Sequence, residues 1–124
     1  MAKSTQKRTP EGRLVAQNRR ARHDYEIVDT FEAGIVLVGS EVKSVRDGKV
    51  QLRDAYARVQ DGEVWLHGVY IPPYGPAARD NHEPERPRKL LLHRREIERL
   101  TGRVAERGLT LVPTRMYFAG PQSR

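Results

Sequence analysis

A basic segment near the start of the chain holds the first residues whose types and spacing could do chemistry. Residues 18–25 read Asn-Arg-Arg-Ala-Arg-His-Asp-Tyr. Arginine binds phosphate groups, an asparagine amide can read a base edge, and a histidine or tyrosine ring can stack on an unpaired base. The segment therefore predicts an RNA contact made by Asn18, Arg19, Arg20, Arg22 and His23.

Two further groups combine cations with apolar residues. Residues 88–95 read Arg-Lys-Leu-Leu-Leu-His-Arg-Arg, and residues 41–46 read Glu-Val-Lys-Ser-Val-Arg. A buried strand with solvated charges at its ends explains the leucines, and a surface helix explains residues 41–46. Arg88, Lys89 and Lys43 are nevertheless candidate phosphate partners, on the strength of their charge.

Enzyme chemistry finds little support. His23 and Asp24 could form a general-base pair, but successive residues of a strand point to opposite faces, which argues against this pairing. There is no phosphate-binding loop, no metalloprotease motif and no nucleophile elbow. The chain has no cysteine, and none of its four histidines has metal-ligand spacing. We therefore expect no enzyme activity, no metal and no cofactor.

The distribution of charge favours a polyanionic partner. The chain has 124 residues and a formal net charge of +7. Residues 1–23 and 86–124 are strongly basic, whereas acidic residues outnumber basic ones in residues 24–85. Clustered cations bind nucleic acid because they release condensed counterions. A merely well-solvated surface is the alternative, but most of the C-terminal cations are arginines, whose planar forks suit phosphates and base edges.

Apolar periodicity predicts several short strands that would position these residues. Residues 24–31 alternate as a half-buried strand does, and residues 35–38 resume the pattern after Gly34. Residues 55–60 and 63–71 predict a hairpin around Asp61 and Gly62. Residues 90–92 and 109–118 add further strand segments. Residues 14–21 are compatible with either a short helix or an arm.

Two helices and one fold class follow from the remaining pattern. A short helix is expected from Ser40 to about Asp47, and a longer one through Ile97 and Val104 that ends at Gly108. We expect a mainly β fold, a small antiparallel OB-like barrel with one main and one or two minor helices. An open α+β sheet is the alternative.

The chain is predicted to hold one folded domain. Residues 1–16 are expected to be a flexible basic arm, residues 17–118 the OB-like RNA-binding domain, and residues 119–124 a short C-terminal remnant. No apolar run approaches the ~20 residues that a membrane-spanning helix needs. No export signal is visible at the N-terminus. A cytoplasmic protein without a membrane partner is therefore expected.

At several of these motifs the sequence closely resembles the small protein B family, which binds transfer-messenger RNA in bacterial trans-translation. The resemblance covers about residues 17–118, in this order: residues 18–25, Phe31-Glu32-Ala33-Gly34, Gly39-Ser40-Glu41-Val42-Lys43-Ser44, Arg88-Lys89-Leu90-Leu91-Leu92-His93 and Leu109-Thr110-Leu111-Val112-Pro113. It implies an OB-like barrel that docks at the elbow of the tRNA-like domain of this RNA. It also implies delivery of the RNA to a ribosome stalled on a broken message, with elongation factor Tu and alanyl-tRNA synthetase acting on the same RNA.

The resemblance assigns roles to individual residues. It implies that Asn18, Glu32 and Leu91 contact RNA, and that His23 approaches the decoding centre of the small ribosomal subunit. Members of the family continue with another strand and a basic tail, where this sequence ends at Arg124. We expect a shortened chain, because residues 109–118 would otherwise lack a pairing partner and leave a sheet edge exposed.

One other function remains open at this point. A general single-strand-binding protein on an OB scaffold would use the basic arm, with Tyr56, Trp65 and Tyr70 as stacking platforms. An RNA-modifying or hydrolytic enzyme that uses His23 and Asp24 is the weakest interpretation.

Overall fold

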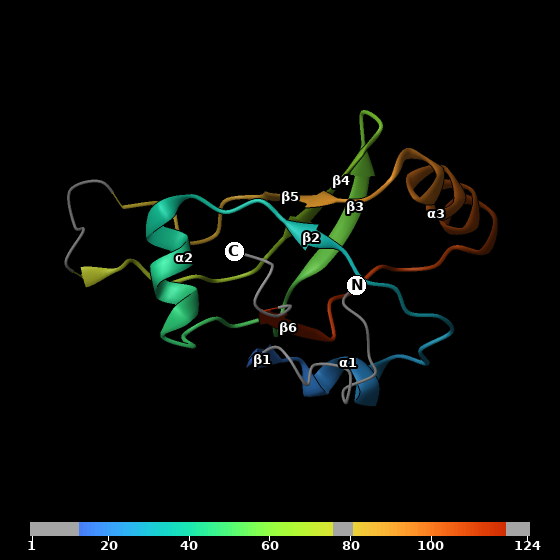
Figure 1. The fold of residues 1–124 in the computed structure, drawn as a ribbon. Helices are drawn as coiled ribbons and strands as arrows, with labels where there is room; N and C mark the ends of the chain where they lie inside the picture. Colours follow the sequence, from blue (N-terminus) through green and yellow to red (C-terminus); the bar gives the residue numbers. More distant parts are fainter. Residues whose placement is uncertain (1–12, 76–80, 119–124) are drawn as a thin grey trace.

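The computed structural model of this chain describes residues 13–75 and 81–118. Six short strands and three helices follow one another along these residues (Figure 1): β1 (Arg13–Gln17), α1 (Arg19–Asp24), β2 (Gly34–Ile35), α2 (Gly39–Arg46), β3 (Tyr56–Gln60), β4 (Glu63–His67), β5 (Arg88–Leu91), α3 (Arg94–Arg107) and β6 (Arg115–Phe118).

The strands form two antiparallel sheets. One sheet has the order β2-β5-β4-β3, and the other pairs β1 with β6. An isolated bridge joins the sheets, because the Ala57 amide on β3 donates to the Leu111 carbonyl at 2.8 Å, four residues before β6 begins. In Figure 1, α2 and α3 lie toward opposite ends of the four-stranded sheet, and the two-stranded sheet lies below it with α1.

The core lies between the four-stranded sheet and the elements around it. Alternate residues of β4 and β5 are buried there, including Val64, Leu66 and Leu90. Val45 of α2 and Ile97 of α3 join the same cluster. Each helix therefore packs a single apolar stripe onto the strands, as an amphipathic helix does.

Left-handed backbone positions confirm two boundaries that the sequence predicts. Asp61 and Gly62 join β3 to β4 with φ angles of 54° and 78°, which is the geometry of a tight hairpin turn. Gly108 ends α3 with a φ of 65°, and its amide donates to the Val104 carbonyl.

The expected fold class is confirmed: the fold is mainly antiparallel β, with one main helix and two shorter ones. Among the described residues the strands do not close into a continuous barrel. The expected strand over residues 24–31 is wrong, because α1 ends at Asp24 and the chain then runs outside both sheets to β2.

The N-terminal strand corrects two further expectations. β1 begins at Arg13, inside the range expected to be a flexible arm, whose residues 1–12 lie outside the described part. β1 also pairs with β6, so the segment that was expected to lack a partner has one. Within the described ranges, no helix is long and apolar enough to cross a membrane.

Candidate nucleic-acid interface

Asn18 holds the basic segment in place from a buried position. Its side chain caps α1, with Oδ1 accepting from the Ala21 amide at 3.3 Å. Its Nδ2 donates to the carbonyls of Leu52 at 3.1 Å and Pro113 at 3.2 Å. The residue is 7% exposed. Both ends of the Asn18 amide therefore bind backbone groups in this conformation, and contact of Asn18 with RNA stays a prediction.

The helix that Asn18 caps presents cations to solvent. Arg19, Arg20, Arg22 and His23 are all exposed, and the His23 side chain is 88% exposed. α1 has no acidic residue in its first turn, and its last turn contains Arg22 and His23. The positive charge of Arg22 in the last turn suits the negative end of the helix dipole.

His23 and Asp24 do contact each other, because they lie at the end of a helix and not on a strand. His23 Nδ1 lies 3.1 Å from Asp24 Oδ1, and Arg20 Nε lies 3.5 Å from Asp24 Oδ2. The hydrogen bond from His23 lowers the pKa of Asp24, and the charge of Arg20 adds to this effect. The argument against the pairing from strand geometry is therefore wrong, although the pair stands in open solvent.

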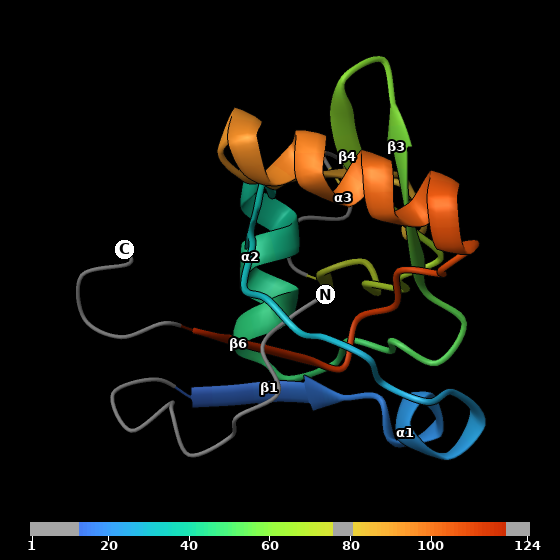
Figure 2. The ribbon, with the colours of Figure 1, turned by 90° about the vertical axis from the view of Figure 1, so that its right-hand side faces the viewer.

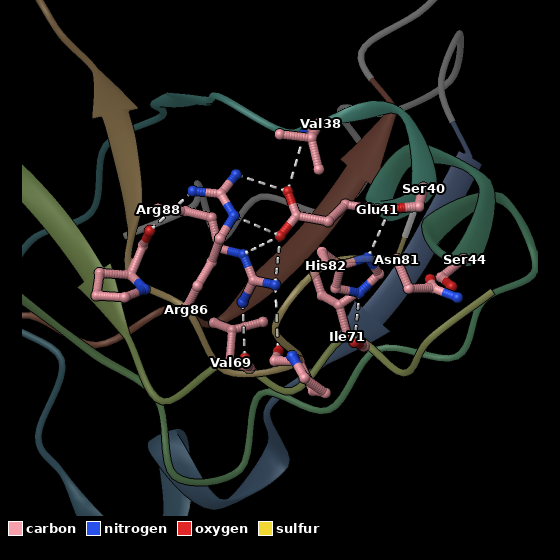
Figure 3. A network of polar contacts seen from close by, with 12 residues as sticks. Val38, Ser40, Glu41, Ser44, Val69, Ile71, Asn81, His82, Arg86 and Arg88 are labelled. Carbon is pink, nitrogen blue, oxygen red and sulfur yellow. Dashed lines mark hydrogen bonds and ion pairs between the residues drawn. The ribbon is translucent and has the colours of Figure 1, made fainter. Parts of the chain in front are cut away.

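Arg88 lies inside the protein, bound to protein groups, and a phosphate contact for it stays a prediction. It is fully buried, and so is Glu41 of α2. Arg88 Nε donates to Glu41 Oε2 at 2.8 Å, and Nη1 donates to the Val69 carbonyl at 2.9 Å (Figure 3). Arg86 also binds Glu41, through Nε at 2.9 Å and Nη2 at 2.8 Å. We call Glu41, Arg86 and Arg88 the buried ion cluster.

Hydrogen bonds outweigh the effect of burial on Glu41 of the buried ion cluster, which favours its ionised form. Burial raises the pKa of Glu41, but hydrogen bonds from Arg86, the Val38 amide and Arg88 bring that pKa below its usual value. Burial lowers the pKa of Arg88, and Glu41 opposes this shift. The cluster ties β5 to α2, two elements that are far apart in the sequence.

Neighbouring contacts also attach Pro72 and His82 to α2. His82 Nε2 donates to the Ile71 carbonyl at 2.8 Å, and His82 Nδ1 lies 2.8 Å from Ser40 Oγ (Figure 3). Ser44 Oγ donates to the Pro72 carbonyl at 2.7 Å. The buried ion cluster therefore holds the start of β5 against α2, and the contacts of Pro72 and His82 hold neighbouring parts of the chain to the same helix.

Those following residues point outward from the four-stranded sheet. Lys89 lies directly opposite Trp65 of β4, and Leu91 lies opposite Gly34 of β2. Because side chains alternate along a strand, Lys89 and Leu91 share the face opposite to Arg88 and Leu90. Leu91 is 52% exposed although it is a large apolar residue. We call this surface the outer sheet face.

Two residues on the outer sheet face, Arg58 and His67, were not predicted, and Tyr56 was predicted only as a stacking platform of the alternative function. Tyr56 and His67 are cross-strand partners whose rings stack at 5.3 Å with an interplanar angle of 12°. Arg58 lies opposite Trp65 on the same face. Tyr70, in contrast, is in a bridge with Gln51, outside the named strands. The sequence could have predicted this group, because the alternation of side chains along a hairpin with its turn at Asp61 and Gly62 places Tyr56, Arg58 and His67 on one face.

Glu32 and Lys43 occupy separate places. Glu32 is exposed in the segment before β2, two residues from Gly34. Lys43 is exposed on α2, and its ammonium lies 5.7 Å from the ring centre of Tyr74. Lys89 Nζ lies 3.6 Å from Glu63 Oε2. The predicted residues thus divide into α1, the outer sheet face with nearby Glu32, the surface of α2, and the interior.

Metal ligation has no support within the described ranges. No group of three or more histidine, cysteine, aspartate or glutamate residues comes close enough there to hold an ion. The exposed side of α1 and the outer sheet face can bind phosphates and can stack on or pack against bases.

Comparison with known proteins gives a consistent result. The family model described as SmpB protein matches residues 15–123. An SsrA-binding protein of Syntrophobacter fumaroxidans is 56% identical over 119 residues, which cover 96% of this chain and 74% of the relative. An SsrA-binding protein of Symbiobacterium thermophilum is 64% identical over 104 residues, which cover 84% of this chain and 66% of the relative.

A solved structure agrees with these sequence matches. A chain from a structure described as "tmRNA-SmpB: a journey to the center of the bacterial ribosome" superposes with a TM-score of 0.69. That chain is 56% identical in sequence, and the match covers 84% of this chain and 73% of the other.

Proposed function

This chain belongs to the SmpB protein family, and on that premise we propose that it binds the tRNA-like domain of transfer-messenger RNA. It acts as an adaptor that brings this RNA to stalled ribosomes in trans-translation. The names of the relatives and of the structural neighbour support this proposal, since they refer to SsrA, tmRNA and the bacterial ribosome. We propose that the adaptor acts in the cytoplasm and that its role is binding without catalysis.

The outer sheet face carries the proposal at the level of residues. A half-exposed Leu91 beside Lys89 and Trp65 offers an apolar contact for a base next to a cation for a phosphate. Arg19, Arg20, Arg22 and His23 on α1 add a second group of exposed contacts, and Glu32 and Lys43 complete the proposed set. Asn18 and Arg88 contribute indirectly, because they hold α1 and β5 in position.

The variant Leu91→Asp tests this assignment. An aspartate at this half-exposed position leaves the core intact but places a negative charge where RNA would bind, so affinity for the tRNA-like domain is expected to fall at least tenfold. The matched control is Val28→Asp, because Val28 is also a large exposed apolar residue, at 56%. Equal affinities for the two variants and the wild type, measured by filter binding, would remove Leu91 from the interface.

A second candidate function has one observation in its favour. The stacked pair of Tyr56 and His67, beside Trp65, resembles the aromatic platforms on which single strands stack. A general single-strand-binding protein would therefore show strong quenching of Trp65 fluorescence with any unstructured oligonucleotide. The adaptor function predicts quenching by the tRNA-like domain that an excess of such oligonucleotides does not reverse.

A further inference from the structure

We propose that one face of α3 is a second RNA-binding surface, which binds the sugar–phosphate backbone of a double-stranded RNA. The proposal rests on a regular row of four arginines, Arg95, Arg99, Arg103 and Arg107. Residues four apart lie on the same side of a helix, about 6 Å apart along its axis. We call these four residues the α3 arginine row.

The α3 arginine row is largely free to bind a partner. Arg95, Arg99 and Arg107 are exposed, and within the described part of the chain neither Arg95 nor Arg107 has a hydrogen bond or ion pair. Arg103 donates to Asp29 Oδ2 at 2.8 Å, and this hydrogen bond, together with one from the Thr30 amide, lowers the pKa of Asp29. The row is therefore anchored at one position and open at the others.

Acidic residues of α3 do not neutralise the row. Glu96 is occupied in capping the helix, since its Oε1 accepts from the His93 amide at 2.8 Å. Helical geometry places Glu98 on the other flank of the exposed side, near Arg94. Glu96 and Glu106 share the face of the row by helical spacing. The face keeps a net positive charge of one even when Asp29, Glu96 and Glu106 are all included, because the row has four arginines.

The position of α3 separates the row from part of the proposed interface. Figure 2 shows the whole length of α3 on the outside of the molecule, and Figure 1 places it at the other end of the four-stranded sheet from α2, which carries Lys43. The row begins four residues after Leu91 and extends about 18 Å along the helix. The chain can therefore present cations in two directions.

Double-stranded RNA fits this surface better than an acidic protein does. The planar fork of arginine binds phosphate with two parallel hydrogen bonds, and a regularly spaced row of such forks, which winds gradually around the helix, can follow a curved backbone. No large exposed apolar residue of α3 accompanies the row, whereas the core of a protein–protein interface needs apolar anchors. The inference also rests on the proposed function, because an adaptor between an RNA and a ribosome needs more than one RNA-binding surface.

Two opposite changes of charge test the proposal. The variant Arg95→Gln/Arg99→Gln should bind a 20-base-pair RNA duplex at least tenfold more weakly near 0.1 M salt, and its salt slope should be smaller by about 1.5. Glu106→Gln should bind the same duplex more tightly. The control Lys49→Gln/Arg53→Gln removes the same charge from exposed positions between α2 and β3 and should change binding much less.

The tRNA-like domain of transfer-messenger RNA is the second probe. If Arg95→Gln/Arg99→Gln binds the duplex more weakly but keeps its affinity for this domain, the row is a separate RNA-binding surface. If Arg95→Gln/Arg99→Gln loses the same affinity for both RNAs, the row is part of the proposed interface and the inference is overturned. Equal losses of duplex affinity in the test and control variants would overturn it as well. Weaker binding of a polyglutamate peptide alone would overturn it in favour of an acidic protein partner. A wild-type chain that binds the duplex but not the tRNA-like domain would contradict the proposed function instead.

Discussion

At the scale of single residues, positively charged side chains serve different purposes according to the face of the strand on which they lie. Arg88 is buried and Lys89 is half-buried on the opposite face, although the two are neighbours in a charged run. The sequence partly predicts the burial of Arg88, since alternation along a strand places it on the same face as the apolar Leu90. It does not reveal Glu41, the partner 47 positions away that allows a guanidinium to be buried.

Asn18 shows the same limit of the sequence, and its role leads to a prediction. Asn18→Ala removes a helix cap and leaves two buried carbonyls without their donor, so it should lower the free energy of unfolding by about 2–4 kcal/mol. Urea unfolding measures this change. Asn18→Asp keeps the capping oxygen but loses the amide donors, so its free energy of unfolding should lie between those of the wild type and Asn18→Ala. A fully stable Asn18→Ala chain would contradict the anchoring role.

The buried ion cluster predicts a pH dependence. The pKa of Glu41 is lower in the folded chain than its usual value of 4.5. Its contribution is therefore complete above pH 4.5 and is lost as the pH falls through the folded-state pKa. Glu41→Gln should cost about 3–5 kcal/mol at pH 7, because it leaves buried arginines without their counter-charge. It should also flatten the acid limb of the stability curve.

Urea midpoints between pH 3 and pH 7 measure this effect. Glu85→Gln is the control, since Glu85 is exposed and should leave both the midpoint and the acid limb nearly unchanged. Parallel acid limbs for Glu41→Gln and the wild type would show that another carboxylate controls acid unfolding.

At the scale of elements, local signals predict turns and the long helix well. The hairpin at Asp61 and Gly62 and the end of α3 at Gly108 depend on left-handed backbone positions, which these residue types favour. α1 was harder to predict, because it has six residues and buries only Ala21. A remote set of backbone carbonyls holds its cap, and no local pattern reports such contacts.

Two glycines with nearly the same backbone geometry give the prediction at this scale. Gly62 and Gly68 have φ angles of 78° and 79°. A side chain at Gly62 meets open space, whereas one at Gly68 would lie 2.6 Å from the Asp54 carbonyl oxygen. Gly62→Ala should cost about 1–2 kcal/mol for its backbone alone. Gly68→Ala should cost at least 1 kcal/mol more, and equal unfolding midpoints would contradict the close approach.

At the scale of the whole molecule, the charge distribution and the fold class were both accessible from the sequence. What the sequence could not supply was the sorting of cations into exposed and buried sets. That sorting depends on how β5 lies against α2 and how α1 lies against residues 52 and 113, and these contacts join segments far apart in the chain. Stability and RNA binding are therefore expected to depend on different residues of the same motifs.

Linkage between binding and folding separates the two kinds of residue. An RNA that binds only the folded chain stabilises it by about 2.7 kcal/mol when its free concentration is 100 times Kd. With the tRNA-like domain at such a concentration, Asn18→Ala should start from a lower Tm but gain as much stability as the wild type. Leu91→Asp should start from nearly the wild-type Tm and gain much less. If Asn18→Ala instead loses the gain while keeping its Tm, Asn18 contacts RNA directly and its amide leaves its carbonyl partners in the complex.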